Sequence, residues 1–474
     1  MGSAPRNKEQ LSTMIEQSTK RETLATRLGF IMLSAGCAIG LGNVWRFPFI
    51  VGKFGGGIFV FLYLFFLAIL GFPVLMVELA IGRAGRSNLV GSFRKLAVAH
   101  KTSWTILAHI MIAGGFILMI YYTCVSGWLF AYTGYFARGV NAACSTAESN
   151  GQFFNGLIQS ASRSSLYMLL ATLLGSVICW FGIQKGVEKC VKYLMCALLG
   201  LMLVLAGYAL STPGRREGLA FYLWPNWGNF IQRPLETIFA AMGQAFFTLS
   251  LGVGSMTIFG SYLKWKKPLA KECLWIILLD TFVALCAGVI VFPICKSYAV
   301  NVNQGPGLLF VSLPSIFNNI PLGRLWGTLF FLFMAMAALT TIVAVFENLI
   351  AYLQDEYRFS RRKATSLVGI AVAVLSLPCV FGYNLLSCLK PFGGDSTILD
   401  FEDFLVSQNL LPLGSLAMIC FCLWKGGWGE QHFWEECEAG QEWHFPQLVR
   451  FYSKYILPLV IILVFVMGYI QMFR

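Results

Sequence analysis

The chain contains about eleven separate apolar stretches, and this pattern restricts its fold more than any other feature. Each is long enough to cross a bilayer as a helix, which takes about 20 residues. The predicted spans are residues 25–54, 57–82, 104–136, 166–183, 187–211, 236–263, 272–298, 325–355, 364–386, 401–425 and 449–472. Only 12% of the residues are charged, whereas soluble proteins carry roughly 25%. We therefore expect an all-α membrane protein with about 11 transmembrane helices.

Basic residues predict the orientation of these spans. Residues 1–23 are polar and charged and lack the short apolar core of a cleavable signal, so we expect a cytoplasmic tail. The inner segments then hold 24 of the 35 Lys and Arg residues, which satisfies the positive-inside rule and places the C-terminus outside. The net charge of +13 thus reflects topology and gives no support to nucleic-acid binding. No glycosylation sequon is present, which favours a bacterial inner (plasma) membrane.

Two of the predicted spans are interrupted near their middle. Residues 36–48 read GCAIGLGNVWRFP and residues 244–255 read QAFFTLSLGVGS. Glycine and proline weaken a helix, and an arginine at this depth is costly unless it faces a cavity or a partner. A GxxxG helix-packing motif would explain some of these glycines. It would not explain Asn43, Arg46 or the break in the second span. Backbone groups freed at membrane depth need partners, which an ion or a substrate can supply.

The two interrupted spans are five spans apart, a spacing that predicts two inverted repeats of five helices each. Residues 24–211 would form the first repeat and residues 236–425 the second. Residues 449–474 would hold the last span and the C-terminus, outside the repeats. Half-helix N-termini favour a carboxylate, and freed carbonyls favour a cation. An enzyme is not indicated, because the four histidines are scattered and pair with no nucleophile.

The chain resembles the neurotransmitter:sodium symporter family, in its bacterial amino-acid transporter form with eleven spans and a leucine-transporter-like fold. The motifs that carry this resemblance are Arg21-Glu22, residues 36–48, Gly55–Gly57, Glu78, Gly82-Arg83, Tyr121-Tyr122, residues 184–188, 247–254, 305–307 and 337–341, Asp355, and residues 400–403. The resemblance implies a sodium-coupled symporter that works by alternating access. Glu78 is expected to accept hydrogen bonds from amides freed by the two breaks.

The resemblance also implies two Na⁺ sites. Sodium site 1 would share the carboxylate of the substrate and use Ala38, Asn43, Thr248 and Asp280. Sodium site 2 would use Gly36, Ile39, Ala337, Thr340 and Thr341. The last three residues fall at i, i+3 and i+4, on one face of a helix. The alternative is that both threonine hydroxyls bond to their own helix, as membrane threonines commonly do.

Two departures from the family pattern lie near sodium site 1. Asp280 stands where the bacterial prototype has Asn, and Ala284 stands where relatives carry Glu or Ser. Because Ala284 can neither supply charge nor hold an anion by a hydroxyl, we expect Asp280 to supply the negative charge and chloride not to be required. The alternative is a structural carboxylate that shares a proton.

By the same resemblance, the organic substrate lies between spans 1, 3, 6 and 8. The implied residues are Cys37, Ala38, Gly40, Gly42, Leu118, Tyr122, Phe247, Thr248, Ser250, Val253, Thr341 and Val345. Gly40 replaces the Asp of monoamine carriers and leaves room for an α-carboxylate on the amides of the first break. Tyr122 would donate to that carboxylate, and Phe247 would close above it. Val253 replaces a larger Phe, and no charge lines the pocket, so we expect a neutral, bulky hydrophobic or aromatic L-amino acid.

Two ion pairs would control access to the substrate site. The outer gate would pair Arg46 with Asp403; the alternative partner is Asp400, which lies a turn further out. The inner gate would consist of Arg21, Asp355, Ser261 and Tyr262, although Arg21 and Asp355 are also compatible with solvated surface charges. The alternative function is a channel-like or ligand-sensing membrane protein that keeps the sodium and amino-acid site without tight coupling. Gate pairs at both faces argue against a channel, which needs only one.

Overall fold

The computed structural model describes residues 24–472 except 142, 226, 264–266, 299–306 and 443, and in this part every regular element is a helix. The first half contains α2 (Arg27–Ala38), η1 (Gly42–Arg46), α3 (Phe47–Lys53), α4 (Gly57–Phe66), η2 (Leu67–Gly71), α5 (Phe72–Gly85), α6 (Leu89–Leu96), α7 (Lys101–Arg138), α8 (Ala147–Ile158), α9 (Ala161–Trp180), η3 (Ile183–Glu188), α10 (Lys189–Ser211), α11 (Arg215–Leu223) and α12 (Trp227–Gln232). The second half contains α13 (Pro234–Thr248), α14 (Ser255–Ser261), α15 (Leu269–Ser297), η4 (Leu308–Ser312), α16 (Leu313–Asn318), α17 (Gly323–Tyr357), α18 (Arg361–Leu375), α19 (Leu377–Phe381), α20 (Ile398–Asp403), η5 (Phe404–Leu410), α21 (Leu411–Leu423), α22 (Glu430–Glu438), α23 (Gln447–Phe451), η6 (Tyr452–Ile456) and α24 (Leu457–Met472). The η elements are π-helical turns.

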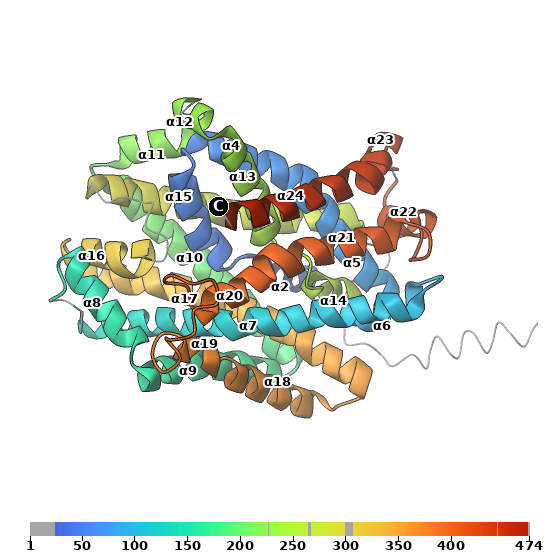
Figure 1. The fold of residues 1–474 in the computed structure, drawn as a ribbon, viewed down its shortest axis with the longest axis horizontal. Helices are drawn as coiled ribbons and strands as arrows, with labels where there is room; N and C mark the ends of the chain where they lie inside the picture. Colours follow the sequence, from blue (N-terminus) through green and yellow to red (C-terminus); the bar gives the residue numbers. More distant parts are fainter. Residues whose placement is uncertain are drawn as a thin grey trace, which may run out of the picture.

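The long helices run roughly parallel to the horizontal axis of Figure 1 and form one bundle. Nine helices in the described residues are long and apolar enough to cross a membrane, or ten if the bent pair Arg27–Ala38 and Gly42–Lys53 counts as one span. Helices α13 and α14 have 15 and 7 residues, so neither crosses alone, but together they occupy the predicted sixth span. With this broken span included, the helices account for all of the predicted spans.

The first break lies where the sequence predicts it. Helix α2 ends at Ala38, and Ile39 is extended, with φ −70° and ψ 99°. The chain resumes at Gly42 after a bend of 55°, and its first turn is the π-helical turn η1. Such turns occur frequently at functional sites. Pro48 is tolerated in the first turn of α3, where a missing N–H costs little.

The second break is stabilised by a carboxylate from another helix. Helix α13 ends at Thr248, and Gly252 beyond it has φ +100°, a left-handed conformation that favours glycine. The buried Glu78 of α5 accepts from Gly252 N at 2.6 Å and from Met256 N at 3.2 Å. Among the described residues, its backbone partners lie at the second break. The role predicted for Glu78 is therefore seen there and not at the first break.

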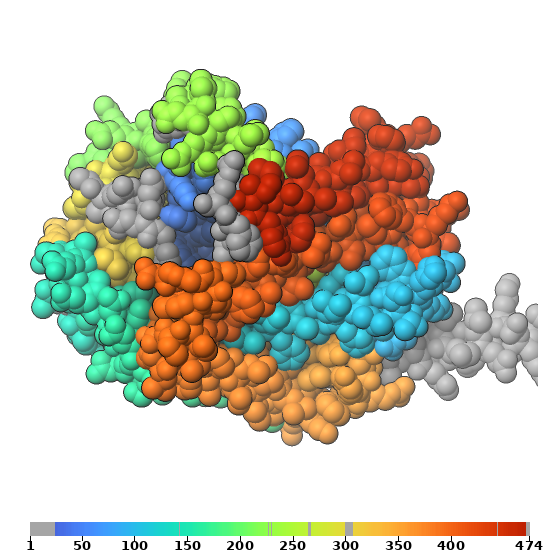
Figure 2. Space-filling view, in the orientation of Figure 1, coloured from blue at the N-terminus to red at the C-terminus, as the bar shows by residue number. Residues whose placement is uncertain are grey.

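Helix α17 lies at the centre of the bundle, where it packs against α2, α7, α9 and α10. Its residues from Ala337 to Ala351 are buried on all sides, as expected for a helix with apolar residues around its whole circumference. The predicted threonine ligands therefore lie deep in the protein. In contrast, α24 lies at the surface and forms the red area of Figure 2.

Candidate functional site

A small cavity lies where the two broken spans meet α7, α17 and α21. Its volume is about 20 Å³, which is room for about one water molecule. It is lined by Ala38, Gly40, Leu41, Gly42, Leu118, Tyr122, Phe247, Ser250, Thr341 and Leu411. None of these side chains is charged, and all except Leu41 and Leu411 belong to the substrate site predicted from the sequence.

Four predicted substrate residues do not line this cavity: Cys37, Thr248, Val253 and Val345. All four are buried. Cys37 is adjacent to the cavity, since its carbonyl accepts from Ser250 Oγ at 3.4 Å. Val253 lies beside α7, where a Cβ built on Gly114 would be 3.4 Å from Val253 Cγ1. Thr248 belongs to the polar group of sodium site 1.

The backbone of the first break faces the cavity because Gly40 has no side chain. A Cβ at Gly40 would lie 2.5 Å from Tyr122 Oη and 2.7 Å from Thr341 Oγ1, which is too close for either atom to stay in place. Leu41 N donates to Tyr122 Oη at 3.2 Å. A backbone amide and a phenolic hydroxyl thus meet at one point, an arrangement suited to a carboxylate.

The side chains predicted for sodium site 1 form a fully buried polar group beside this cavity. Asn43 Nδ2 donates to Asp280 Oδ1 at 2.8 Å and to Thr248 Oγ1 at 3.0 Å, and Thr248 Oγ1 donates to Asp280 Oδ2 at 3.0 Å. Ala38, the fourth predicted member, lines the cavity itself. In the described part of the chain, the partners of Asp280 are neutral and none is basic. A buried carboxylate is costly without a positive partner, so this group suits a cation.

The residues predicted for sodium site 2 also come together. Thr341 Oγ1 lies 3.3 Å from the carbonyl oxygen of Ile39 and 3.4 Å from those of Gly36 and Ala337. Thr340 Oγ1 donates to the Ala337 carbonyl at 2.9 Å. Thr340 thus bonds within its own helix, whereas Thr341 also reaches the first break. Oxygen ligands from two elements are what a hard cation requires.

The predicted outer gate is not in direct contact. The guanidinium carbon of Arg46 lies 4.0 Å from the ring centroid of Phe247, which is a cation–π geometry. Asp403 Oδ1 accepts from Ser407 Oγ at 2.6 Å. Among the described residues, Arg46 and Asp403 make no nitrogen–oxygen contact within 4.0 Å, because the guanidinium lies on the aromatic ring instead.

The predicted inner gate is seen only in part, since Arg21 lies outside the described residues. Asp355 accepts from Asn88 N at 2.7 Å, from Asn88 Nδ2 at 3.1 Å and from Ser87 Oγ at 3.1 Å. Ser261 Oγ donates to a carbonyl of its own helix at 2.6 Å. The start of α6 thus holds the carboxylate of Asp355 from one side.

Tyr262, the remaining inner-gate residue, contacts an ion pair that the sequence analysis missed. Its hydroxyl donates to Glu347 Oε1 at 2.8 Å, and Arg361 binds the same carboxylate with nitrogen–oxygen distances of 2.6 and 3.2 Å. The Glu347 side chain is fully buried, and that of Arg361 is 13% exposed. The available signal was a carboxylate inside the apolar eighth span, since such a charge requires a partner.

Comparisons with known proteins agree along nearly the whole chain. The sequence profile of the Sodium:neurotransmitter symporter family matches residues 21–150 and 148–474. The uncharacterized sodium-dependent transporter YhdH of Bacillus subtilis is 32% identical over 443 residues, covering 93% of this chain and 96% of that protein. The human sodium- and chloride-dependent GABA transporter 2 is 27% identical over 398 residues, covering 73% of this chain and 64% of that protein.

A solved structure supports the same relationship. The crystal structure of MhsT in complex with L-phenylalanine superposes with a TM-score of 0.84 at 34% identity, covering 94% of this chain and all of that one. The predicted helical membrane fold with broken spans is thereby confirmed. This chain belongs to the sodium:neurotransmitter symporter family, and it is an integral membrane protein that couples transport to sodium.

Proposed function

We propose that the protein imports a neutral, bulky hydrophobic or aromatic L-amino acid together with sodium, by alternating access. The observation that carries this proposal is the central cavity, where a carboxylate-binding point adjoins two groups of oxygen atoms and no lining side chain is charged. The similar solved structure was obtained with L-phenylalanine, which supports an amino acid of this class.

The α-carboxylate of the substrate would bind Leu41 N and the hydroxyl of Tyr122, which already point toward each other. The side chain of the substrate would then extend among Leu118, Phe247 and Leu411. An ionised side chain would lose its water there without gaining a partner. Because the cavity of about 20 Å³ is smaller than any amino acid, binding requires these walls to separate.

The two sodium sites would couple the ions to this movement. In sodium site 1, rotation of the Asn43 amide would replace its nitrogen by its oxygen beside Asp280, so that the cation gains a carboxylate and an amide ligand. In sodium site 2, Na⁺ would bridge the end of α2 to α17 and hold the broken span in place. Two Na⁺ ions moving inward would gain about 4.6 kcal/mol per 100 mV, enough for roughly thousandfold accumulation.

We also propose that residues 24–211 and 236–425 form the two inverted repeats, with the N-terminus inside and the C-terminus outside a bacterial inner membrane. The two breaks fall at corresponding places in these segments, as this architecture requires. The excess of basic residues in alternate loops supports the orientation.

Uptake into proteoliposomes tests the proposed function directly. Labelled L-phenylalanine should accumulate above its outside concentration when Na⁺ is present outside, and not when choline replaces Na⁺. L-Tryptophan, L-tyrosine and L-leucine should compete, whereas glutamate, lysine and phenylethylamine should compete weakly. Stronger competition by the last three would contradict the substrate class. Sodium-dependent binding without accumulation would instead indicate the channel-like or sensing alternative.

A further inference from the structure

A large groove lies on the outside of the bundle, between α9 and α18. Its volume is about 600 Å³, and its lining residues run from Leu169 to Phe181 on one helix and from Thr365 to Ala373 on the other. Only 33% and 39% of the apolar stretches of these two spans are buried in the protein, so both helices face the membrane. None of the residues assigned to the substrate, sodium or gate sites lines this groove.

Two hydroxyl groups on the walls of this groove have no hydrogen-bond partner among the described residues. They are Ser176 Oγ on α9 and Thr365 Oγ1 on α18, and both atoms are buried. Thr365 as a whole is 1% exposed. Thr172 in the same groove behaves differently, since its hydroxyl donates to the Met168 carbonyl at 3.0 Å. Buried hydroxyl groups are nearly always paired, so each of these two keeps an unused donor in the wall of the groove.

The two unpaired hydroxyls lie at the same depth. Thr365 is four residues from the start of α18 at Arg361, and Ser176 is four residues from the end of α9 at Trp180. At 1.5 Å per residue, each lies about 6 Å inside its helix end. Arg361 Nε donates to the Cys179 carbonyl at 2.9 Å, which holds the two ends together. The headgroup layer of a bilayer is roughly 5–7 Å thick, so a lipid ester carbonyl would reach this depth.

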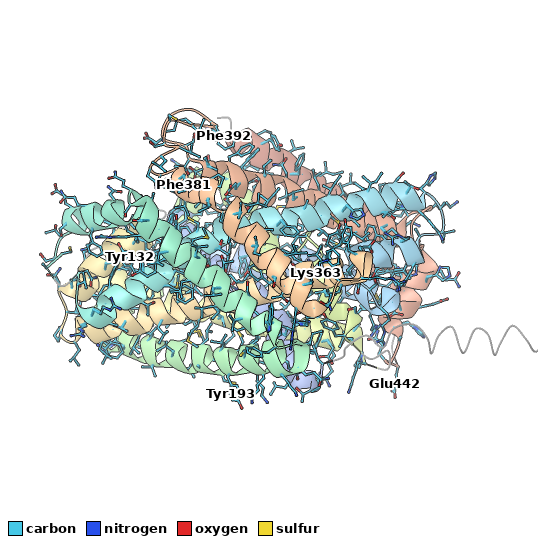
Figure 3. All side chains as sticks on the ribbon, turned by 90° about the horizontal axis from the view of Figure 1, so that it is seen from below. Tyr132, Tyr193, Lys363, Phe381, Phe392 and Glu442 are labelled. Carbon is cyan, nitrogen blue, oxygen red and sulfur yellow. The ribbon has the colours of Figure 1, made fainter. Side chains whose placement is uncertain are left out.

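Exposed basic residues surround this end of the groove. Arg362 precedes Thr365 by three residues and therefore shares its helix face. Lys363 is the residue after Arg362. Figure 3 shows Lys363 near one end of this span and Phe381 near the other. Lys185 follows α9 and is also exposed. Among the described ion pairs, none involves these three side chains. The open end of an apolar groove thus carries positive charge.

We propose that this groove binds one anionic phospholipid. The headgroup lies against Arg362, Lys363 and Lys185, and an acyl chain follows the groove. The side chains of Ser176 and Thr365 rotate so that their buried hydroxyls donate to an ester carbonyl of the lipid. A helix from a second copy of the chain fits less well. It would bring more basic residues to a place that already carries positive charge, which is unfavourable.

Native mass spectrometry of the purified protein tests this proposal with phosphatidylglycerol and phosphatidylcholine of identical chains. The parent protein should retain one phosphatidylglycerol in preference to phosphatidylcholine. Arg362→Gln should weaken this binding about fivefold, as expected for one basic residue near a membrane surface. Thr365→Val should weaken binding of both lipids, and Ala373→Phe should fill the groove and abolish binding. Lys425→Gln, an exposed lysine outside the groove, is the matched control and should bind as the parent does.

Equal retention of the two lipids by the parent protein would overturn the proposal. Unchanged phosphatidylglycerol binding in Arg362→Gln and Thr365→Val would also overturn it. These two variants test the proposal even if Ala373→Phe does not fold. If Ala373→Phe changes a dimer into a monomer while lipid retention stays constant, the groove is a subunit interface and the proposal is wrong. Because the readout is lipid mass, its failure leaves the proposed transport function unaffected.

Discussion

Thr341 is the residue at which the candidate ion and substrate sites meet. Its hydroxyl lies within 3.4 Å of the Gly36 and Ile39 carbonyls, and its side chain also lines the central cavity. A cation bound there would fix the position of the same side chain that borders the substrate. Coupling between ion and substrate therefore needs no long-range relay at this position, since one side chain belongs to both sites.

We expect Thr341→Ala and Thr340→Ala to raise the Na⁺ concentration needed for half-maximal substrate binding. Loss of one oxygen ligand to a charged group costs about 1.5–3 kcal/mol, which corresponds to roughly 10- to 100-fold in Na⁺ affinity. Scintillation proximity binding of labelled substrate across a Na⁺ titration measures the effect. Thr133→Ala is the control, since that hydroxyl donates to the Leu129 carbonyl of its own helix. Equal binding in choline by parent and variants would remove both threonines from an ion site.

Gly40→Ala is expected to abolish substrate binding while the protein still folds. The added methyl group would lie 2.5 Å from Tyr122 Oη and 2.7 Å from Thr341 Oγ1, so it would displace a carboxylate-binding group and an ion-binding group together. Gly134→Ala on α7 is the matched control, because a Cβ there meets nothing within 4 Å. Equilibrium binding, with thermal unfolding measured alongside, separates loss of the site from loss of the fold. Substrate affinity within about twofold of the parent would contradict this account.

At the scale of helices, the sequence predicts the breaks well because their causes are local. Gly40 lies in the first break and Gly252 and Gly254 lie in the second, and glycine weakens a helix whatever surrounds it. The threonine face of α17 is also local, since it follows from the spacing of Ala337, Thr340 and Thr341. That these threonines meet the first break was implied only by family resemblance, because spacing within one helix does not specify the neighbouring helix.

Contacts between helices account for what the sequence analysis missed. Leu411 joins the cavity wall from α21, and Glu347 pairs with an arginine 14 positions later in the next helix. Arg46 lies on Phe247 and not on Asp403. Each of these contacts depends on how two elements are rotated about their axes. The sequence at these positions contains no pattern that specifies how the helices are rotated, whether the side chains are charged or apolar.

The contact between η1 and α13 predicts the behaviour of an outer-gate variant. Arg46 stacks on Phe247, which lines the cavity, so we expect it to control closure above the substrate without touching the carboxylate-binding point. Arg46→Ala should therefore reduce uptake by at least about tenfold while equilibrium substrate binding stays nearly normal. Arg138→Ala, an exposed arginine at the end of α7, should leave both unchanged. Normal uptake rates by Arg46→Ala in proteoliposomes would exclude this residue from gating.

For the whole molecule, the decisive quantity is the charge buried at the centre of the bundle. Asp280 is fully buried, and its partners in the described residues are the neutral Asn43 and Thr248. Because a buried carboxylate with only neutral partners is costly, this position favours binding of a cation such as Na⁺. Two Na⁺ ions and a zwitterionic substrate would bring two positive charges to a region of low dielectric constant. The carboxylate of Asp280 offsets half of that charge.

This balance predicts that transport does not require chloride. Ala284, one helical turn from Asp280 and fully buried, has no hydroxyl to hold an anion, although Tyr63 Oη lies 3.4 Å from Thr248 Oγ1 and Gln244 is nearby. We expect the carboxylate of Asp280 to supply the negative charge that chloride would otherwise bring. Uptake of labelled substrate should therefore continue at the same rate when gluconate replaces chloride on both sides of the membrane.

The Asp280→Asn variant extends this test. Without this carboxylate, the buried carboxylate of Glu78 remains, but its oxygens already bond to the amides of Gly252 and Met256. The variant should therefore either lose transport or transport only when chloride is present. Asp395→Asn, an exposed aspartate in the loop before α20, should behave as the parent protein does. A strict chloride requirement of the parent would show that Asp280 does not replace the anion. Its role would then be confined to ligating sodium, with the counter-charge carried by chloride near Tyr63 and Thr248.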